Sequence, residues 1–307
     1  MTWFLLALIG HLANGVAFII DKVLLGSAFR RSATYAGLVG ALSVLVVFAI
    51  PWMGRWPVGG EWIGPLLSGA TFVLALWAFF AALSRAEASR VVPIVGSLIP
   101  ILTLVGSYLF LNERLADQTI LGFVILIIAT IILSGGGKGR LNQQTVWIAV
   151  LSAMLFAFST ITGKAAYDSL GFLEGFIITR LGAVAISIFI LCVLDREAGR
   201  EFLSILRSTN KKTSKKNKQP GKGSAILALV GQSLGAVGFL FVQWAISKGS
   251  PTIVNSMQAV QYAILLIVGL ALRKRAPKLL GEDVSSNILM VKVGALILTA
   301  IGMALII

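Results

Sequence analysis

Long apolar stretches, separated by short polar connections, follow one another along the whole chain. A helix that crosses a bilayer needs roughly 20 mostly apolar residues. Ten stretches reach or approach that length: 3–22, 33–52, 62–84, 91–111, 118–135, 145–163, 172–194, 224–247, 251–272 and 288–307. The pattern therefore predicts an all-α membrane protein with ten transmembrane helices.

A weak internal repeat relates the first five stretches to the last five. Lys22 falls on Lys164 at a shift of 142 residues, and residues 82–85 fall on 245–248 at a shift of 163. Because five is an odd number, the second half enters the membrane in the opposite sense, which is the inverted-repeat plan of many carriers. We therefore predict two five-helix repeats, 1–140 and 141–307.

One connection is much longer than the others, at about 196–223. It is rich in Lys and Arg and contains the run KKTSKKNKQPGKG. Polar, charged segments with Pro and Gly cannot bury enough apolar surface to fold by themselves. We expect a flexible, solvated linker here.

The composition agrees with a membrane protein, because 57% of the 307 residues are hydrophobic and 12% are charged, against about 25% charged in soluble domains. The net charge of +14 comes from this linker and from helix ends, which is the pattern of topology signals. We therefore expect a multi-pass protein of a prokaryotic plasma membrane that contacts the lipid bilayer and no nucleic acid. Whether the protein forms a homodimer stays open.

Lys and Arg are concentrated in the connections that follow the odd-numbered helices. The positive-inside rule assigns such connections to the cytoplasm. Both termini are then predicted to face outward.

A sequence motif lies in the fourth and fifth stretches. Residues 91–100 read VVPIVGSLIP, residues 111–115 read LNERL, and Gly122 opens an apolar run that ends in Gly135 and Gly136. Together with the preceding turn ALSRA, this segment resembles the EamA-type repeat of the drug/metabolite transporter superfamily. The second half departs from the motif, because Ala276 stands where Glu113 would recur.

The resemblance implies ten helices around a central cavity lined mainly by helices 1, 3, 4, 6, 8 and 9. It implies alternating-access transport of a small solute such as an amino acid, a nucleotide sugar or a drug. It also implies cytoplasmic termini, opposite to the charge distribution, so the orientation stays open.

The ninth predicted helix carries the main candidate residues for solute binding. Asn255, Gln258 and Tyr262 share one helix face, and Gln261 lies beside it. Polar side chains within the hydrocarbon are costly and face protein or water, and amides both donate and accept hydrogen bonds. This suits a polar or zwitterionic solute; the alternative is hydrogen bonding between helices.

Other helices contribute further candidates. His11 and Asn14 lie on the first helix, Trp77 on the third, and Gln232 and Gln243 on the eighth. We include these five in the predicted substrate site. For His11 the competing interpretation, which we favour over a pH-sensitive contact with the substrate, is a neutral ring bonded to a neighbour; for Trp77 it is ordinary packing.

Four residues are predicted to have gating or charge roles. Pro93 and Pro100 can loosen the fourth helix, and Glu113 is the acidic residue of the motif. Arg180 lies within the seventh helix, where it must pair, snorkel or face water. We favour a structural tie to a carbonyl or to Glu174 over anion binding.

The sequence offers no pattern for catalysis, metal binding or an ATP motor. It has one His and one Cys, and its glycine–lysine loops do not fit the phosphate-binding motif. We therefore predict a carrier of a small polar metabolite, amino acid-like or drug-like, without cofactor. The alternative is a membrane scaffold or lipid-interacting protein that uses the basic linker. Deletion of 209–220 discriminates between the two, because a carrier should keep its flux and a scaffold should lose its partner.

Overall fold

The computed structural model describes residues 2–24, 31–86, 88–134, 142–208, 222–272 and 286–306. Every regular element within these ranges is a helix. In chain order they are α1 (Thr2–Leu24), α2 (Ser32–Leu42), the 3-10 helices η1 (Ser43–Trp52) and η2 (Gly59–Trp62), α3 (Ile63–Leu83), α4 (Ala88–Phe110), α5 (Asp117–Ser134), α6 (Gln143–Leu170), α7 (Phe172–Phe189), the π-helical segment η3 (Ile190–Leu194), α8 (Arg196–Ser208), α9 (Lys222–Lys248), α10 (Pro251–Ser256), α11 (Gln258–Leu272) and α12 (Ser286–Ile306).

Within the described residues, four helical stretches are long and apolar enough to cross a membrane: Ser32–Trp52, Gly59–Leu83, Gln143–Leu170 and Phe172–Leu194. Shorter apolar helices accompany them, and large apolar side chains face outward. Phe48 and Phe110 are each 76% exposed, which favours contact with acyl chains over contact with water. The protein is an integral, multi-pass membrane protein, as predicted.

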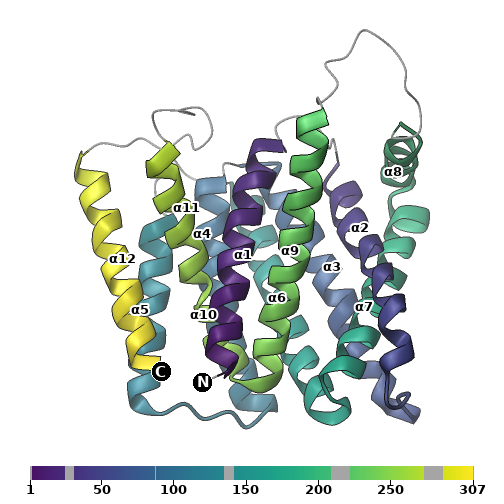
Figure 1. Ribbon diagram of the computed structural model, residues 1–307, viewed down its shortest axis with the longest axis horizontal. Coiled ribbons are helices and arrows are strands. Elements are labelled where there is room, and N and C mark those ends of the chain that lie inside the picture. The colour runs from purple at the N-terminus through teal and green to yellow at the C-terminus, as the bar shows by residue number, and fades with distance from the viewer. Residues whose placement is uncertain are drawn as a thin grey trace.

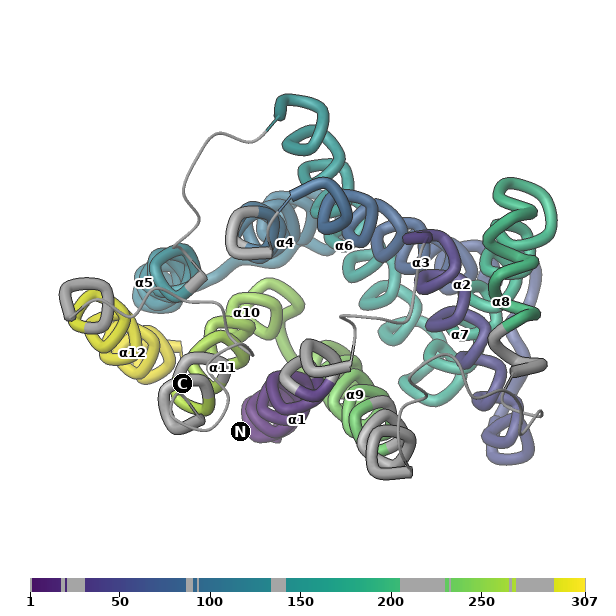
Figure 2. The backbone as a smooth tube through the Cα atoms, turned by 90° about the horizontal axis from the view of Figure 1, so that it is seen from above, coloured from purple at the N-terminus to yellow at the C-terminus, as the bar shows by residue number. Residues whose placement is uncertain are grey.

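The helices stand side by side, with both chain ends on the same side of the molecule (Figure 1). Seen from above, α3, α4, α6 and α7 lie opposite α1, α9 and α11, while α5 and α12 lie together at one end (Figure 2). The most extensive helix contacts join α1 to α9 and α3 to α6. In contrast, α9 touches α6 and α7 only lightly.

Helix α7 packs against α3 at two glycines that leave no room for a side chain. A Cβ on Gly69 would lie 2.6 Å from the backbone nitrogen of Ala183, and a Cβ on Gly182 would lie 2.8 Å from the Cα of Leu66. Small residues allow such close approach of helix backbones in membranes. The position of α7 relative to α3 is therefore tightly fixed.

Residues 196–208 form helix α8 rather than part of a flexible linker. The Asp195 carboxylate accepts a hydrogen bond from the Ala198 backbone at 2.9 Å, which is typical of a residue that starts a helix. Ala198 is buried and Phe202 packs in the same cluster, and this i, i+4 spacing gives α8 an apolar face. At the other end of the expected linker, residues 222–223 begin α9, and residues 209–221 lie outside the described residues.

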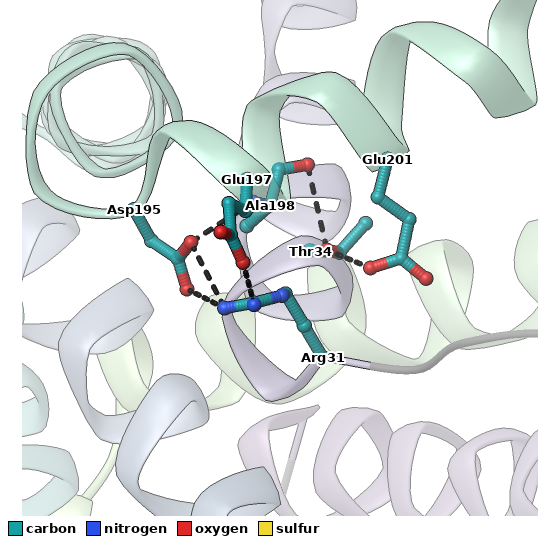
Figure 3. A network of polar contacts seen from close by, with 6 residues as sticks. All are labelled: Arg31, Thr34, Asp195, Glu197, Ala198 and Glu201. Atoms are coloured by element: carbon teal, nitrogen blue, oxygen red, sulfur yellow. Dashed lines mark hydrogen bonds and ion pairs between the residues drawn. The ribbon is translucent and has the colours of Figure 1, made fainter.

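Polar contacts hold α8 against the start of α2 (Figure 3). Arg31 lies 3.3 Å from the Asp195 carboxylate and also pairs with Glu197. Thr34 donates a hydrogen bond to Glu201 at 2.7 Å. These contacts join residues more than 160 positions apart in the chain and fix α8 beside α2.

Candidate functional site

The ninth predicted helix, 251–272, is interrupted at Met257, within its first third. Helix α10 ends at Ser256, Met257 forms a turn, and α11 begins at Gln258. Irregular backbone at membrane depth is tolerated where it is buried in protein or lines a cavity, and carriers commonly bind solutes at such broken helices. The break is therefore the natural centre of a candidate site.

Asn255 joins three helices at this break. Its amide nitrogen donates to the hydroxyl of Thr103 on α4 at 3.0 Å and to the hydroxyl of Thr160 on α6 at 3.4 Å. The two threonines donate in turn to carbonyls of their own helices, those of Ile99 and Phe156. Both N–H groups of the amide are thus occupied, and among the described residues its oxygen is left as an acceptor for a solute.

Gln258 and Tyr262 lie together on α11, as their spacing predicts. The Gln258 amide donates to the Tyr262 hydroxyl at 2.9 Å. That hydroxyl lies against α4, because a Cβ on Gly96 would come within 2.6 Å of it. The face that carries Asn255, Gln258 and Tyr262 is therefore directed at α4.

His11 links α1 to the same break. Its ring is 5% exposed, and Nε2 donates to the carbonyl oxygen of Val254 at 2.8 Å. A helix end leaves its last carbonyls without partners in the helix, and His11 supplies one for α10. The side chain of Gln261 also lies beside the ring.

The remaining candidates are not gathered at the break. Asn14 lies against the backbone of Gly238, where α1 and α9 approach closely. Trp77 packs in an apolar cluster with α2 and α7, which supports the packing interpretation. Gln243 is half-buried on α9, and the side chain of Gln232 lies outside the described residues.

Helix α4 runs from Ala88 to Phe110 through both prolines without a break. Pro100 is buried within it, whereas the side chain of Pro93 lies outside the described residues. A gating role for either proline stays a prediction.

Glu113 connects the α4–α5 turn to the start of α10. Asn112 adopts a positive φ of 53°, a conformation that asparagine tolerates better than most residues, and the Glu113 N–H donates to the Ser107 carbonyl. The Glu113 carboxylate then accepts a hydrogen bond from the Thr252 hydroxyl at 2.8 Å. A negative charge at the start of a helix is favourable, so this residue positions α10.

We expect Glu113→Gln to lower the free energy of unfolding by about 1–2 kcal/mol. The charge-assisted hydrogen bond from Thr252 becomes a neutral one, and the favourable interaction of the negative charge with the start of α10 is lost. Thermal unfolding in detergent micelles measures the change. Asp117→Asn is the control, since that carboxylate is exposed at the start of α5, and its effect should be smaller. An equal effect of the two changes would contradict the role of Glu113.

Arg180 is buried in α7 with 7% exposure and lies among three phenylalanine rings. Its guanidinium carbon is 4.9 Å from the ring centre of Phe72 on α3, 5.5 Å from that of Phe176, and 4.4 Å from that of Phe239 on α9. Nε and Nη2 have no hydrogen-bond partner. Among the described residues no ion pair joins Arg180 to Glu174, whose carboxylate accepts a hydrogen bond from the Gly54 backbone at 2.8 Å, so the favoured tie to a carbonyl or to Glu174 stays a prediction.

The contacts with the three phenylalanine rings offset part of the cost of burying the Arg180 charge, but they give Nε and Nη2 no hydrogen-bond acceptor. Placing an arginine at the centre of a membrane helix costs about 2.5–3.5 kcal/mol on insertion scales. Each cation–π contact contributes about 0.5–2 kcal/mol, so three contacts are of the same order. Each buried N–H without an acceptor still costs about 1–3 kcal/mol.

The sequence pattern did not predict the residues that contact Asn255 and Arg180. Thr103 and Thr160 carry no distinctive signal, because threonine within an apolar helix commonly bonds its own helix backbone. Phe72 and Phe239 are far apart in the chain, and phenylalanine is expected anywhere in a membrane helix. A helix-face plot would have placed Phe176 near Arg180, since they are four residues apart.

A comparison with known families finds a match to the first part of the chain. Residues 1–135 match the EamA-like transporter family, which belongs to the drug/metabolite transporter superfamily. No curated protein matches. A structure described as "Crystal structure of protein" is similar over 99% of this chain and 95% of that chain, with a TM-score of 0.65 and 18% identity, a likeness of fold alone.

Proposed function

Because residues 1–135 match the EamA-like transporter family, we propose that this membrane protein carries a small polar metabolite, amino acid-like or drug-like, across the bilayer by alternating access. The observation that carries the proposal is the hydrogen-bonded group of Asn255, Thr103 and Thr160. It lies where α4, α6 and a broken helix meet. Discontinuous helices at the interface of repeats form the solute sites of many carriers.

We also propose that the chain forms ten spans in two inverted repeats, 1–140 and 141–307. In this scheme α1 corresponds to α6, α3 to α9, and α5 to α12. The contact of α1 with α9 then becomes that of α6 with α3, and these are the two most extensive helix contacts. The equivalence supports a twofold relation between the halves.

The uneven packing around α9 supports alternating access. Helix α9 packs tightly on α1, while α7 packs tightly on α3, and the contacts of α9 with α6 and α7 are sparse. The boundary is bridged mainly by side chains, such as Phe239 of α9 against Phe72 and Arg180, so movement of α1 and α9 relative to α3, α6 and α7 separates side chains rather than closely packed backbones. Rocking of one helix group against the other around a fixed site is the common mechanism of such carriers.

We expect Gln258→Ala to lower transport about three- to tenfold without lowering abundance in the membrane. Its amide bonds to Tyr262 within one helix, so its loss removes a polar group from the site while the helix packing remains. A thermal-shift screen over metabolite classes first identifies a stabilising solute, and uptake into proteoliposomes then measures flux.

Gln118→Ala is the control, because Gln118 is exposed at the start of α5. Its flux should equal that of the unchanged protein. Undiminished flux in Gln258→Ala at normal abundance would exclude Gln258 from the site. Failure of every solute class to stabilise the protein or cross the membrane would contradict the carrier function itself.

A further inference from the structure

One edge of the Arg180 guanidinium lacks a hydrogen-bond acceptor. A guanidinium is planar and has five N–H donors, and Nε and Nη2 carry the two donors that point side by side from one edge. Both atoms are buried without a hydrogen-bond partner. The rings of Phe72, Phe176 and Phe239 surround the group, but a phenylalanine ring has no oxygen or nitrogen atom that could accept a hydrogen bond from it.

A second buried donor lies nearby. Tyr167 on α6 is 4% exposed, its hydroxyl also lacks a hydrogen-bond partner, and its ring packs against Gly175 of α7, the helix that carries Arg180. Among the described residues no carboxylate forms an ion pair with Arg180. Three donors in this region therefore lack an acceptor, and the region carries a positive charge.

We propose that the Nε–Nη2 edge of Arg180 binds an oxyanion of the transported solute, a carboxylate or a phosphate group. Such groups match the planar fork of arginine and accept two parallel hydrogen bonds from it. The Tyr167 hydroxyl is a further buried donor without a partner. This inference rests on the proposed transport function and narrows the solute to an organic anion.

The packing around Arg180 provides a route to the buried edge. Gly69 and Gly182 fix α7 against α3, whereas α9 touches α7 only lightly. Phe239, whose ring centre is 4.4 Å from the guanidinium carbon, belongs to α9. Separation of α9 from α7 withdraws this ring and exposes the edge while Arg180 stays in place, so anion binding is coupled to the proposed rocking movement.

The test measures thermal unfolding of the purified full-length protein in detergent at constant ionic strength. The probes are phenylacetate, its neutral analogue phenylacetamide, and inorganic phosphate. We expect phenylacetate, phosphate or both to raise the unfolding temperature, and phenylacetamide to leave it unchanged. An effect of phosphate alone assigns a phosphorylated solute, and an effect of phenylacetate alone assigns a carboxylate. No effect of either anion overturns the proposal.

Two variants separate anion binding from a structural role. Arg180→Met removes an unpaired buried charge, so the protein without anion should unfold at the same temperature or higher, and the anion effect should vanish. Arg180→Lys keeps the charge without the fork and should bind the anion about 10- to 100-fold more weakly. If Arg180→Met does not fold, the weaker anion binding of Arg180→Lys tests the proposal instead. A large loss of stability in Arg180→Lys with an unchanged anion response overturns the proposal.

Arg55→Met is the matched control for net charge. Arg55 pairs with Glu61 at 2.7 Å outside the bundle, and its loss should leave the anion effect intact. Anion binding is measured without transport, so the two proposals fail separately. Flux of an uncharged solute with no anion effect contradicts this inference alone, and an Arg180-dependent anion effect with no flux of any solute contradicts the carrier function.

Discussion

Gly69→Ala is expected to lower the free energy of unfolding by about 2–3 kcal/mol, as overpacking of a close contact does. The new Cβ would lie 2.6 Å from the Ala183 nitrogen and 2.9 Å from the Thr179 carbonyl carbon. These are backbone atoms, which cannot rotate away, so α3 and α7 must separate. Arg180 follows Thr179 directly, and the change should therefore also loosen its contact with Phe72.

Gly64→Ala is the control on the same helix. The nearest heavy atom to a Cβ there is the Thr162 carbonyl oxygen, at 4.0 Å. Alanine has the higher helix propensity, by about 1 kcal/mol, so this change should leave stability equal or raise it. Both variants are compared by thermal unfolding in detergent, followed by the fluorescence of the seven tryptophans. Equal unfolding temperatures would show that α3 and α7 do not approach closely at Gly69.

Hydrophobic patterning predicts where helices lie, because burial in lipid dominates their placement, but it misses how they end. The sixth predicted helix ends at 163, whereas α6 continues to Leu170. Lys164 pairs with Asp168 one turn later at 2.8 Å, so charged residues extend the helix. Helix α8 was missed for the same reason, since its apolar face is narrow among charged residues.

The break in the ninth helix could not be predicted from composition. The sequences of α10 and α11 are both apolar, and Met257 is not a turn-forming residue. The break depends on tertiary contacts, among them the His11 bond to Val254 and the Asn255 bonds to α4 and α6. Sequence reasoning did select His11, Asn255 and Gln258, because such side chains are costly in lipid.

Asn255→Leu is expected to lower transport about 10- to 100-fold while the protein remains folded. Leucine is close to asparagine in shape, and Thr103 and Thr160 keep their bonds to the carbonyls of Ile99 and Phe156. No protein donor is therefore left unpaired, and the cost to folding should be small. A solute that loses its partner in the site instead meets an apolar group, which is penalised by an unsatisfied hydrogen bond.

Uptake into proteoliposomes at matched protein content measures this effect, and thermal unfolding without solute measures the cost to the fold. Ser256→Ala is the control next in the chain, because its hydroxyl donates only to the Ile253 carbonyl of its own helix at 2.7 Å. Its flux should stay close to that of the unchanged protein. If Asn255→Leu transports normally, the bonds to Thr103 and Thr160 serve only to pack α10 against α4 and α6. If it unfolds at a much lower temperature, the Asn255 bonds hold the broken helix in place, and the small cost to folding predicted here is wrong.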